Sequence, residues 1–160
     1  MKKVTFLVVM LAFFANISMA QNKERVNAFN YNKNAQSYIT TAEQLMVQNR
    51  VDKAQKQMAN AKIELTRAKT SIDLAAENEE TKNDAKTWHY YGVIYLKIAT
   101  YPEFNDIDTD ALSKCADAFR KLVELDETYF KNNYGEIITY IQSITTNYFN
   151  QGALSYEAGD

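Results

Sequence analysis

The chain has 160 residues, of which 46% are hydrophobic and 24% charged, a composition typical of a globular domain rather than of a disordered chain. Four glycines and one proline are too few for the turns of an all-β sandwich or barrel, so a mostly helical fold is expected. One histidine and one cysteine cannot supply a structural zinc site or an internal disulfide, and a net charge of −2 argues against nucleic-acid binding, which needs a basic surface.

The first twenty residues have the pattern of a secretory signal peptide. Two lysines precede an apolar run over residues 6–15, and Ser18 and Ala20 are small residues at the positions required for cleavage after Ala20. The run is half of the roughly 20 residues needed to span a bilayer, so no stable membrane insertion is expected after cleavage. We therefore expect residues 1–20 to be removed and the protein to be exported, to the periplasm of a Gram-negative cell or to the extracellular space.

The next segments are expected to form a pair of antiparallel helices. Apolar spacing predicts a helix that contains Tyr38 and Ala42, followed by one long helix over residues 51–77. Along the long helix, apolar residues recur at alternating spacings of three and four, a heptad stripe that is rich in alanine. The link Asn49–Arg50 is too short for anything except an antiparallel neighbour.

Three further helices are expected after the polar segment 77–84. One contains Trp88 to Ala99 and is closed by Pro102, the next covers residues 111–123, and the last covers residues 134–158. The last segment begins with β-branched residues that could form a strand, but its apolar spacing is helical and no partner strand is expected. The acidic loop before residue 111 is expected to be solvated, because it lacks the glycine and the glutamate of a calcium-binding EF-hand loop.

Two segments resemble the two helices of a tetratricopeptide (TPR) repeat. The first carries Trp88, a large residue before Gly92, and Tyr95; the second has a small residue, an aromatic and an apolar residue at Cys115, Phe119 and Leu122. Residues 38–61 and 148–160 follow the same offsets less closely. The resemblance implies an all-α fold of antiparallel helix hairpins stacked as a TPR-like α-solenoid.

The same resemblance implies a TPR-like domain over residues 21–160, with units near residues 35–80, 85–127 and 134–160. The opening aromatics Tyr38, Trp88 and Tyr148 are 50 and 60 residues apart instead of the family's 34. We attribute the first excess to the long helix, which two added heptads lengthen without turning its apolar face away. The last unit lacks its second helix, so we expect further repeats to follow residue 160 in a longer protein.

By resemblance, the first helices of the units line a groove that binds a peptide or protein partner. The groove residues expected from their offsets are Ile39, Glu43, Met46, Val47, His89, Val93, Leu96, Lys97, Phe149, Ala153, Tyr156 and Glu157. The alternative role of each residue is packing against a neighbouring hairpin.

No catalytic, metal or cofactor site is expected. His89 has no nucleophile in a recognisable relation to it, and Cys115 lies on an apolar helix face, which is typical of a buried core residue. The eleven tyrosines are expected in the core rather than on a sugar-binding surface. The sequence thus predicts an exported, non-enzymatic scaffold for protein–protein interaction. The alternative is a regulatory or substrate-presenting N-terminal segment of a larger enzyme or secretion-related protein.

Overall fold

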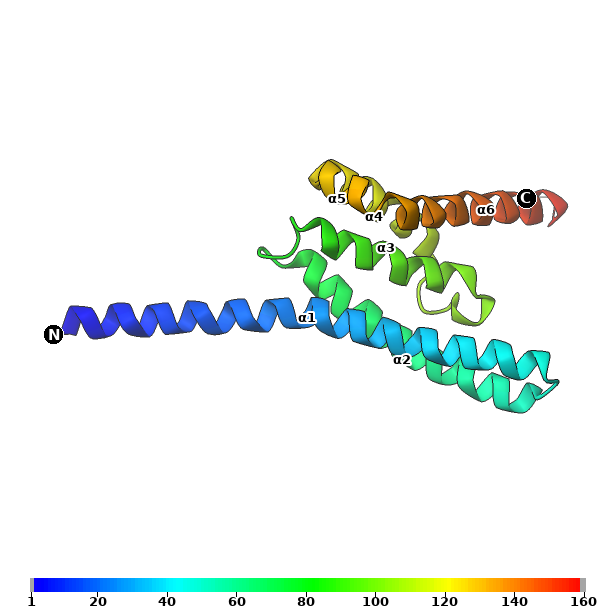
Figure 1. The fold of residues 1–160 in the computed structure, drawn as a ribbon, viewed down its shortest axis with the longest axis horizontal. Coiled ribbons are helices and arrows are strands. Elements are labelled where there is room, and N and C mark those ends of the chain that lie inside the picture. The colour runs from blue at the N-terminus through cyan, green and yellow to red at the C-terminus, as the bar shows by residue number, and fades with distance from the viewer. Residues whose placement is uncertain (1, 159–160) are drawn as a thin grey trace.

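The computed structural model describes the backbone of residues 2–158 and the side chains of residues 23–153 and 156. Throughout this part of the chain the fold is helical, which confirms the all-α prediction (Figure 1). The elements are α1 (Lys2–Val47), α2 (Val51–Glu77), α3 (Ala85–Thr100), the 3-10 turn η1 (Pro102–Phe104), α4 (Ala111–Leu125), α5 (Glu127–Asn132) and α6 (Tyr134–Ala158). The long helix expected over residues 51–77 is α2, and the last segment is a helix rather than a strand. The expected signal peptide lies outside the described side chains and stays a prediction.

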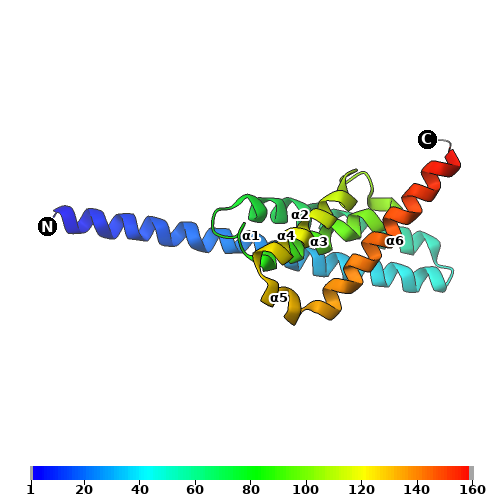
Figure 2. The same ribbon diagram turned by 90° about the horizontal axis from the view of Figure 1, so that it is seen from above.

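The helices pack in chain order as two antiparallel hairpins followed by a single helix. The most extensive contacts are those of α1 with α2 and of α3 with α4. α2 also packs against α3, and α4 against α6, so each helix of the series lies beside the next (Figures 1 and 2). Smaller contacts join α3 to both α1 and α6. α3 thus contacts both α1 and α6, which lie on either side of it in Figure 1.

The first hairpin turns over residues 48–50. Asn49 has a φ of 56°, a left-handed conformation that asparagine tolerates better than most residues. The amide of Arg50 donates to the carbonyl of Leu45 at 2.9 Å, which satisfies an acceptor at the end of α1. The expected tight link between antiparallel helices is confirmed.

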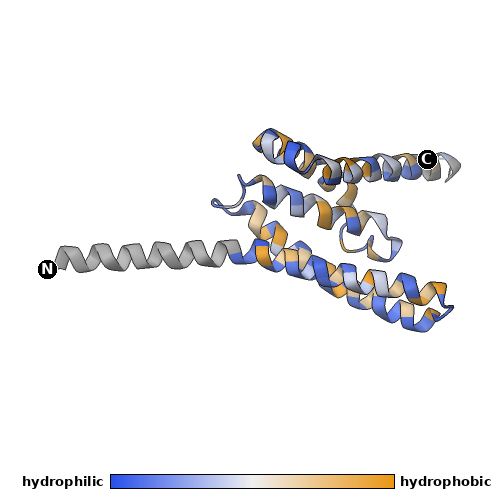
Figure 3. Cartoon of the chain, viewed as in Figure 1, coloured by the Kyte–Doolittle hydropathy of each residue, from blue (hydrophilic) through white to orange (hydrophobic). Residues whose placement is uncertain are grey.

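Small side chains form the contact between α1 and α2. Ala54, Ala61, Ala68 and Ala75 of α2 are exposed by 1% or less. Buried alanines of α1 face them, at positions 28, 35 and 42. Because these facing side chains are small, the helices can approach closely, and Ile39 of α1 and Leu65 of α2 are buried in the same contact. Figure 3 shows hydrophobic and hydrophilic residues alternating along both helices, as expected for helices that are buried on one face.

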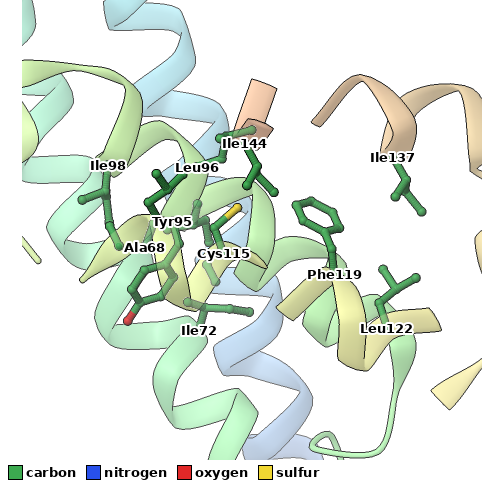
Figure 4. Packing of buried hydrophobic residues seen from close by; sticks show 14 of the residues in the cluster. Ala68, Ile72, Tyr95, Leu96, Ile98, Cys115, Phe119, Leu122, Ile137 and Ile144 are labelled. Carbon is green, nitrogen blue, oxygen red and sulfur yellow. The ribbon is translucent and has the colours of Figure 1, made fainter. Parts of the chain in front are cut away.

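The main core lies between α2, α3, α4 and α6. Tyr95 and Leu96 of α3 belong to the same buried cluster as Cys115 and Phe119 of α4 (Figure 4). α6 contributes Ile144, which is 7% exposed. Cys115 and Phe119 of α4 thus pack against α3. Cys115 is fully buried, as predicted.

The acidic loop between α3 and α4 is packed against the helices and is not simply solvated. Phe104 is fully buried in a cluster formed by α1 and α2. Asp106 pairs with Lys62 of α2 at 2.6 Å, and Asp108 pairs with Lys114 of α4 at 2.7 Å. Only 9% of the Asp108 side chain is exposed. The loop therefore covers the part of the long first hairpin that extends past the second.

A short helix occupies the segment expected as a break after residue 125. Asp126 begins it, since its carboxylate accepts the amide proton of Tyr129 at 2.8 Å and caps α5. α5 ends at Asn132, and α6 starts two residues later. Among the helices of the described residues, none combines the length and apolar character needed to span a membrane.

Candidate partner-binding groove

A continuous groove runs between α1, α3 and α6. It consists of two adjoining cavities of about 510 and 440 Å³. Gln36 of α1, Lys97 of α3 and Tyr140 of α6 line both cavities, so the two share their middle wall. We call this feature the α1/α3/α6 groove. Its larger half, the aromatic half, is lined by several aromatic rings, and its smaller half, the polar half, is lined mostly by residues with polar side chains, among them Thr100, Thr139 and Ser143.

The structure brings four of the predicted groove residues together here. His89, Val93 and Lys97 line the aromatic half, and Leu96 joins Lys97 in the polar half. These residues come from one face of α3, spaced by three and four positions, so a single helix presents them side by side. His89 and Leu96 are nevertheless largely buried, so Val93 and Lys97 offer more of their surface to a ligand.

The other predicted residues lie elsewhere. Ile39 is fully buried between α1 and α2. Glu43 and Met46 line a separate, mainly apolar cavity of about 640 Å³. Its walls are the last part of α1, the first part of α2 and Tyr101. The Tyr101 hydroxyl donates to the Glu43 carboxylate at 3.0 Å, and burial, helped by this bond, raises the pKa of Tyr101 to about 12.

The predicted residues at the two helix ends do not line the groove. Val47 is 87% exposed at the end of α1. Phe149, Ala153 and Tyr156 are exposed on α6 beyond both cavities. The side chain of Glu157 lies outside the described residues. Their predicted role in partner binding stays a prediction.

Lys97 is the charged group at the centre of the groove. Its Nζ donates to Asn32 Oδ1 of α1 at 2.7 Å. Burial lowers the pKa of Lys97 to about 8, because the ammonium has lost much of its hydration. No carboxylate among the described side chains contributes to this pKa. The groove thus holds a partly desolvated amine that forms no ion pair with any of the described carboxylates.

His89 joins α3 to α5 and α6. Its Nδ1 lies 2.9 Å from the Tyr129 hydroxyl of α5, and its ring packs edge-on against the Tyr129 ring at 5.8 Å. The ring of Tyr140 in α6 is 6.1 Å away. Burial lowers the pKa of His89, and the nearby Glu136 carboxylate opposes that shift. His89 is therefore neutral at pH 7 and packs against the neighbouring helices, which is the alternative to a role in partner binding.

Aromatic rings that the sequence argument did not assign to the groove complete its aromatic half. Phe29 of α1 is 42% exposed and lies 5.3 Å from the ring of Tyr90 on α3. Tyr129 and Tyr140 line the opposite wall. The apolar spacing of α1 upstream of Tyr38 runs through residues 35, 31 and 28, so it gave no signal for Phe29.

The groups with catalytic potential are placed as core residues. Cys115 Sγ donates to the carbonyl of Gly92 at 3.2 Å, and burial raises the pKa of the thiol to about 12. A thiol with such a pKa is not a nucleophile at neutral pH. Across the described side chains, no cluster of three or more histidine, cysteine, aspartate or glutamate residues is arranged to hold a metal ion.

Comparison of the chain with models of protein families, with curated proteins and with solved structures finds no match.

Proposed function

We propose that this protein is an exported, non-enzymatic scaffold that binds a peptide or protein partner in the α1/α3/α6 groove. The observation that carries the proposal is the groove itself, two adjoining cavities lined by helices from three successive parts of the chain. A surface of this length suits an extended peptide or a partner helix better than a small, enclosed substrate.

We further propose that the helices form a TPR-like α-solenoid in which α1, α3 and α6 are the first helices of successive units. The order of packing supports this, because α1, α2, α3, α4 and α6 each contact the next in the series. In such an array the first helices share one face, which is where the groove lies. The close approach of α3 and α4 at Gly92 and Phe119 agrees with the resemblance.

Export to the periplasm, with removal of residues 1–20, is part of the same proposal. The segment that follows Ala20 packs against the rest of the fold, through the ion pair of Arg25 with Asp84 and the buried Ala28. Cleavage after Ala20 would leave these contacts intact. The mass of the protein isolated from its own cells tests this step directly.

Affinity capture with a groove-filling variant tests the binding proposal. The full chain carries a C-terminal tag and is expressed in its own cells, and captured proteins are quantified by mass spectrometry. Gln36→Trp places a large ring in the middle of the groove at an exposed position, and we expect it to reduce capture of a specific partner at least tenfold. Gln44→Trp makes the same change on an exposed site of α1 outside the cavities and serves as the control.

The two variants also define the outcome that contradicts the proposal. If Gln36→Trp captures the same partners as the wild type, while its helical signal and melting temperature are unchanged, the groove is not the binding surface. Equal losses in Gln36→Trp and Gln44→Trp would also contradict it.

A further inference from the structure

We propose that the partner segment bound in the α1/α3/α6 groove carries an aromatic side chain next to a carboxylate, and that the Lys97 ammonium pairs with that carboxylate. This inference rests on the proposed function and adds the chemistry of the ligand.

The first step concerns the charge of Lys97. Its Nζ is held toward the groove by one hydrogen bond, to Asn32 Oδ1 at 2.7 Å. An amide oxygen carries no net charge, so it orients the ammonium without neutralising it. An ammonium has three N–H donors, so it can bind a further acceptor while it keeps the bond to Asn32. The acceptor that gains most from a partly desolvated ammonium is an anion, because the pair forms in a medium of reduced dielectric constant.

The second step concerns the other charges of the groove. Glu136 of α6 also lines the aromatic half, but its carboxylate accepts the Tyr140 hydroxyl at 2.7 Å. Lys33 of α1 lies on the same half and is exposed. The groove therefore presents two lysines and one glutamate, which favours an anionic ligand over a cationic one.

The third step concerns the space beside Lys97. The aromatic half has a volume of about 510 Å³ and is lined by Phe29, Tyr90, Tyr129 and Tyr140. Rings of this kind favour an inserted aromatic side chain, through edge-to-face and offset contacts as well as burial of apolar area. Since Lys97 lines the same cavity, one residue or two adjacent residues of a peptide can supply both the ring and the carboxylate.

Three small probes separate the two parts of the proposal. N-acetyl-L-phenylalanine has both the ring and the carboxylate, N-acetyl-L-phenylalaninamide has the ring alone, and N-acetylglycine has the carboxylate alone. Each is titrated into the full chain, purified as the cell processes it, and dissociation constants are measured from amide chemical-shift changes by NMR. We expect N-acetyl-L-phenylalanine to bind about tenfold more tightly than either of the other probes, as one charge-assisted hydrogen bond or one buried ring would give.

Two variants assign the carboxylate preference to Lys97. Lys97→Gln removes the charge and retains a donor for Asn32, so we expect the acid and the amide of phenylalanine to bind it equally. Lys56→Gln removes the same charge from an exposed site of α2 outside the cavities, and we expect it to keep the tenfold preference. The dispersion of the NMR spectrum reports whether each variant is folded. If Lys97→Gln does not fold, Lys97→Arg is measured instead; because it keeps the positive charge, it should retain the preference for the acid.

Several results would overturn the inference. Equal binding of the acid and the amide to the wild type would show that the carboxylate is not recognised, although the groove could still bind a partner. A preference for the acid that persists in Lys97→Gln would place the recognition at another residue. Absence of saturable binding of N-acetyl-L-phenylalanine would refute the proposed ligand chemistry. The affinity capture with Gln36→Trp tests the proposed function independently of this result.

Discussion

The ring of Phe119 occupies the space in which a side chain of Gly92 would lie. A Cβ placed on Gly92 would be 2.6 Å from Phe119 Cε2, closer than two carbon atoms can approach without movement. Phe119 is also stacked on Tyr140 of α6, with ring centroids 5.7 Å apart. The absence of a side chain at Gly92 therefore determines how closely α3, α4 and, through Tyr140, one wall of the groove are packed.

Gly92→Ala tests this relationship. In an exposed part of a helix the change would stabilise the protein by roughly 0.5–1 kcal/mol, because alanine loses less backbone entropy than glycine. Here we expect the steric conflict with the buried Phe119 to dominate and the free energy of unfolding to fall by about 1–3 kcal/mol, measured by urea denaturation.

Gly152→Ala is the matched control for that measurement. Gly152 lies in α6, and beyond its chain neighbours and the backbone of its own helix no described atom lies within 4 Å of the place where its Cβ would be. We expect this variant to be more stable than the wild type by up to about 1 kcal/mol. If both glycine variants are stabilised, the packing of α3 on α4 described above is wrong.

Phe104→Ala tests whether the loop between α3 and α4 is part of the core. Because Phe104 is fully buried against α1 and α2, we expect the change to lower the free energy of unfolding by about 3–5 kcal/mol. Phe149→Ala removes the same ring from a site that is 75% exposed and should change stability by less than about 1 kcal/mol. Similar values for the two variants in urea denaturation would show that the loop is not packed.

The secondary structure was largely predictable because local patterns determine it. The alanine-rich heptad stripe predicted the whole of α2, and the short link at Asn49 predicted the antiparallel hairpin. The position of Phe104 was not predictable, since the loop has no apolar period and the buried residues that surround Phe104 come from α1 and α2, 39 or more positions away in the chain. α5 was missed for a similar reason, because six residues are too few to show helical periodicity.

The candidate site was predictable where the resemblance was most specific. α3 carries the clearest repeat pattern, and there His89, Val93 and Lys97 lie together in one cavity. In α1 the offsets were less certain: Gln36 lines the groove, whereas Ile39 lies on the helix face that packs against α2. Successive residues of a helix are turned by about 100°, so Gln36 and Ile39 are about 60° apart around the axis, and an alignment error of a single position moves a residue to another part of the helix surface.

His89 predicts a loss of stability in weak acid. Burial lowers its pKa in the folded state, so below the ordinary value of 6.5 the unfolded chain binds a proton more readily than the folded one. The free energy of unfolding should therefore decrease as the pH falls from 7 to 5.5, by at most about 1.4 kcal/mol per pH unit from this group. We expect His89→Gln to be less stable at pH 7 but to show a weaker dependence on pH, in urea denaturation at both pH values. An equal or steeper dependence in the variant would contradict this role.

Lys97 predicts a pH dependence of the same sign in weak base. Its pKa of about 8 in the folded state is below that of an unfolded lysine, so between these values the unfolded chain binds more protons and stability should rise with pH. Cys115 acts in the other direction, because its buried thiol keeps its proton while the unfolded thiol loses it. We therefore compare the wild type with Lys97→Met, which retains Cys115. From pH 8 to 9.5 the wild type should gain on the order of 1 kcal/mol relative to the variant, and no difference in slope would show that Lys97 is well hydrated.

Photo-crosslinking from inside and outside the groove tests the proposed scaffold function most directly. p-Benzoylphenylalanine replaces Gln142, an exposed residue of α6 that lines the polar half, or Glu124, an exposed residue of α4 that lines neither half. After irradiation of cells that express the full chain, we expect a discrete crosslinked adduct from p-benzoylphenylalanine at position 142. This adduct should disappear when the same chain also carries Gln36→Trp. Position 124 should give no such adduct. An adduct from position 124 alone, or one from position 142 that Gln36→Trp leaves unchanged, would contradict binding in the α1/α3/α6 groove.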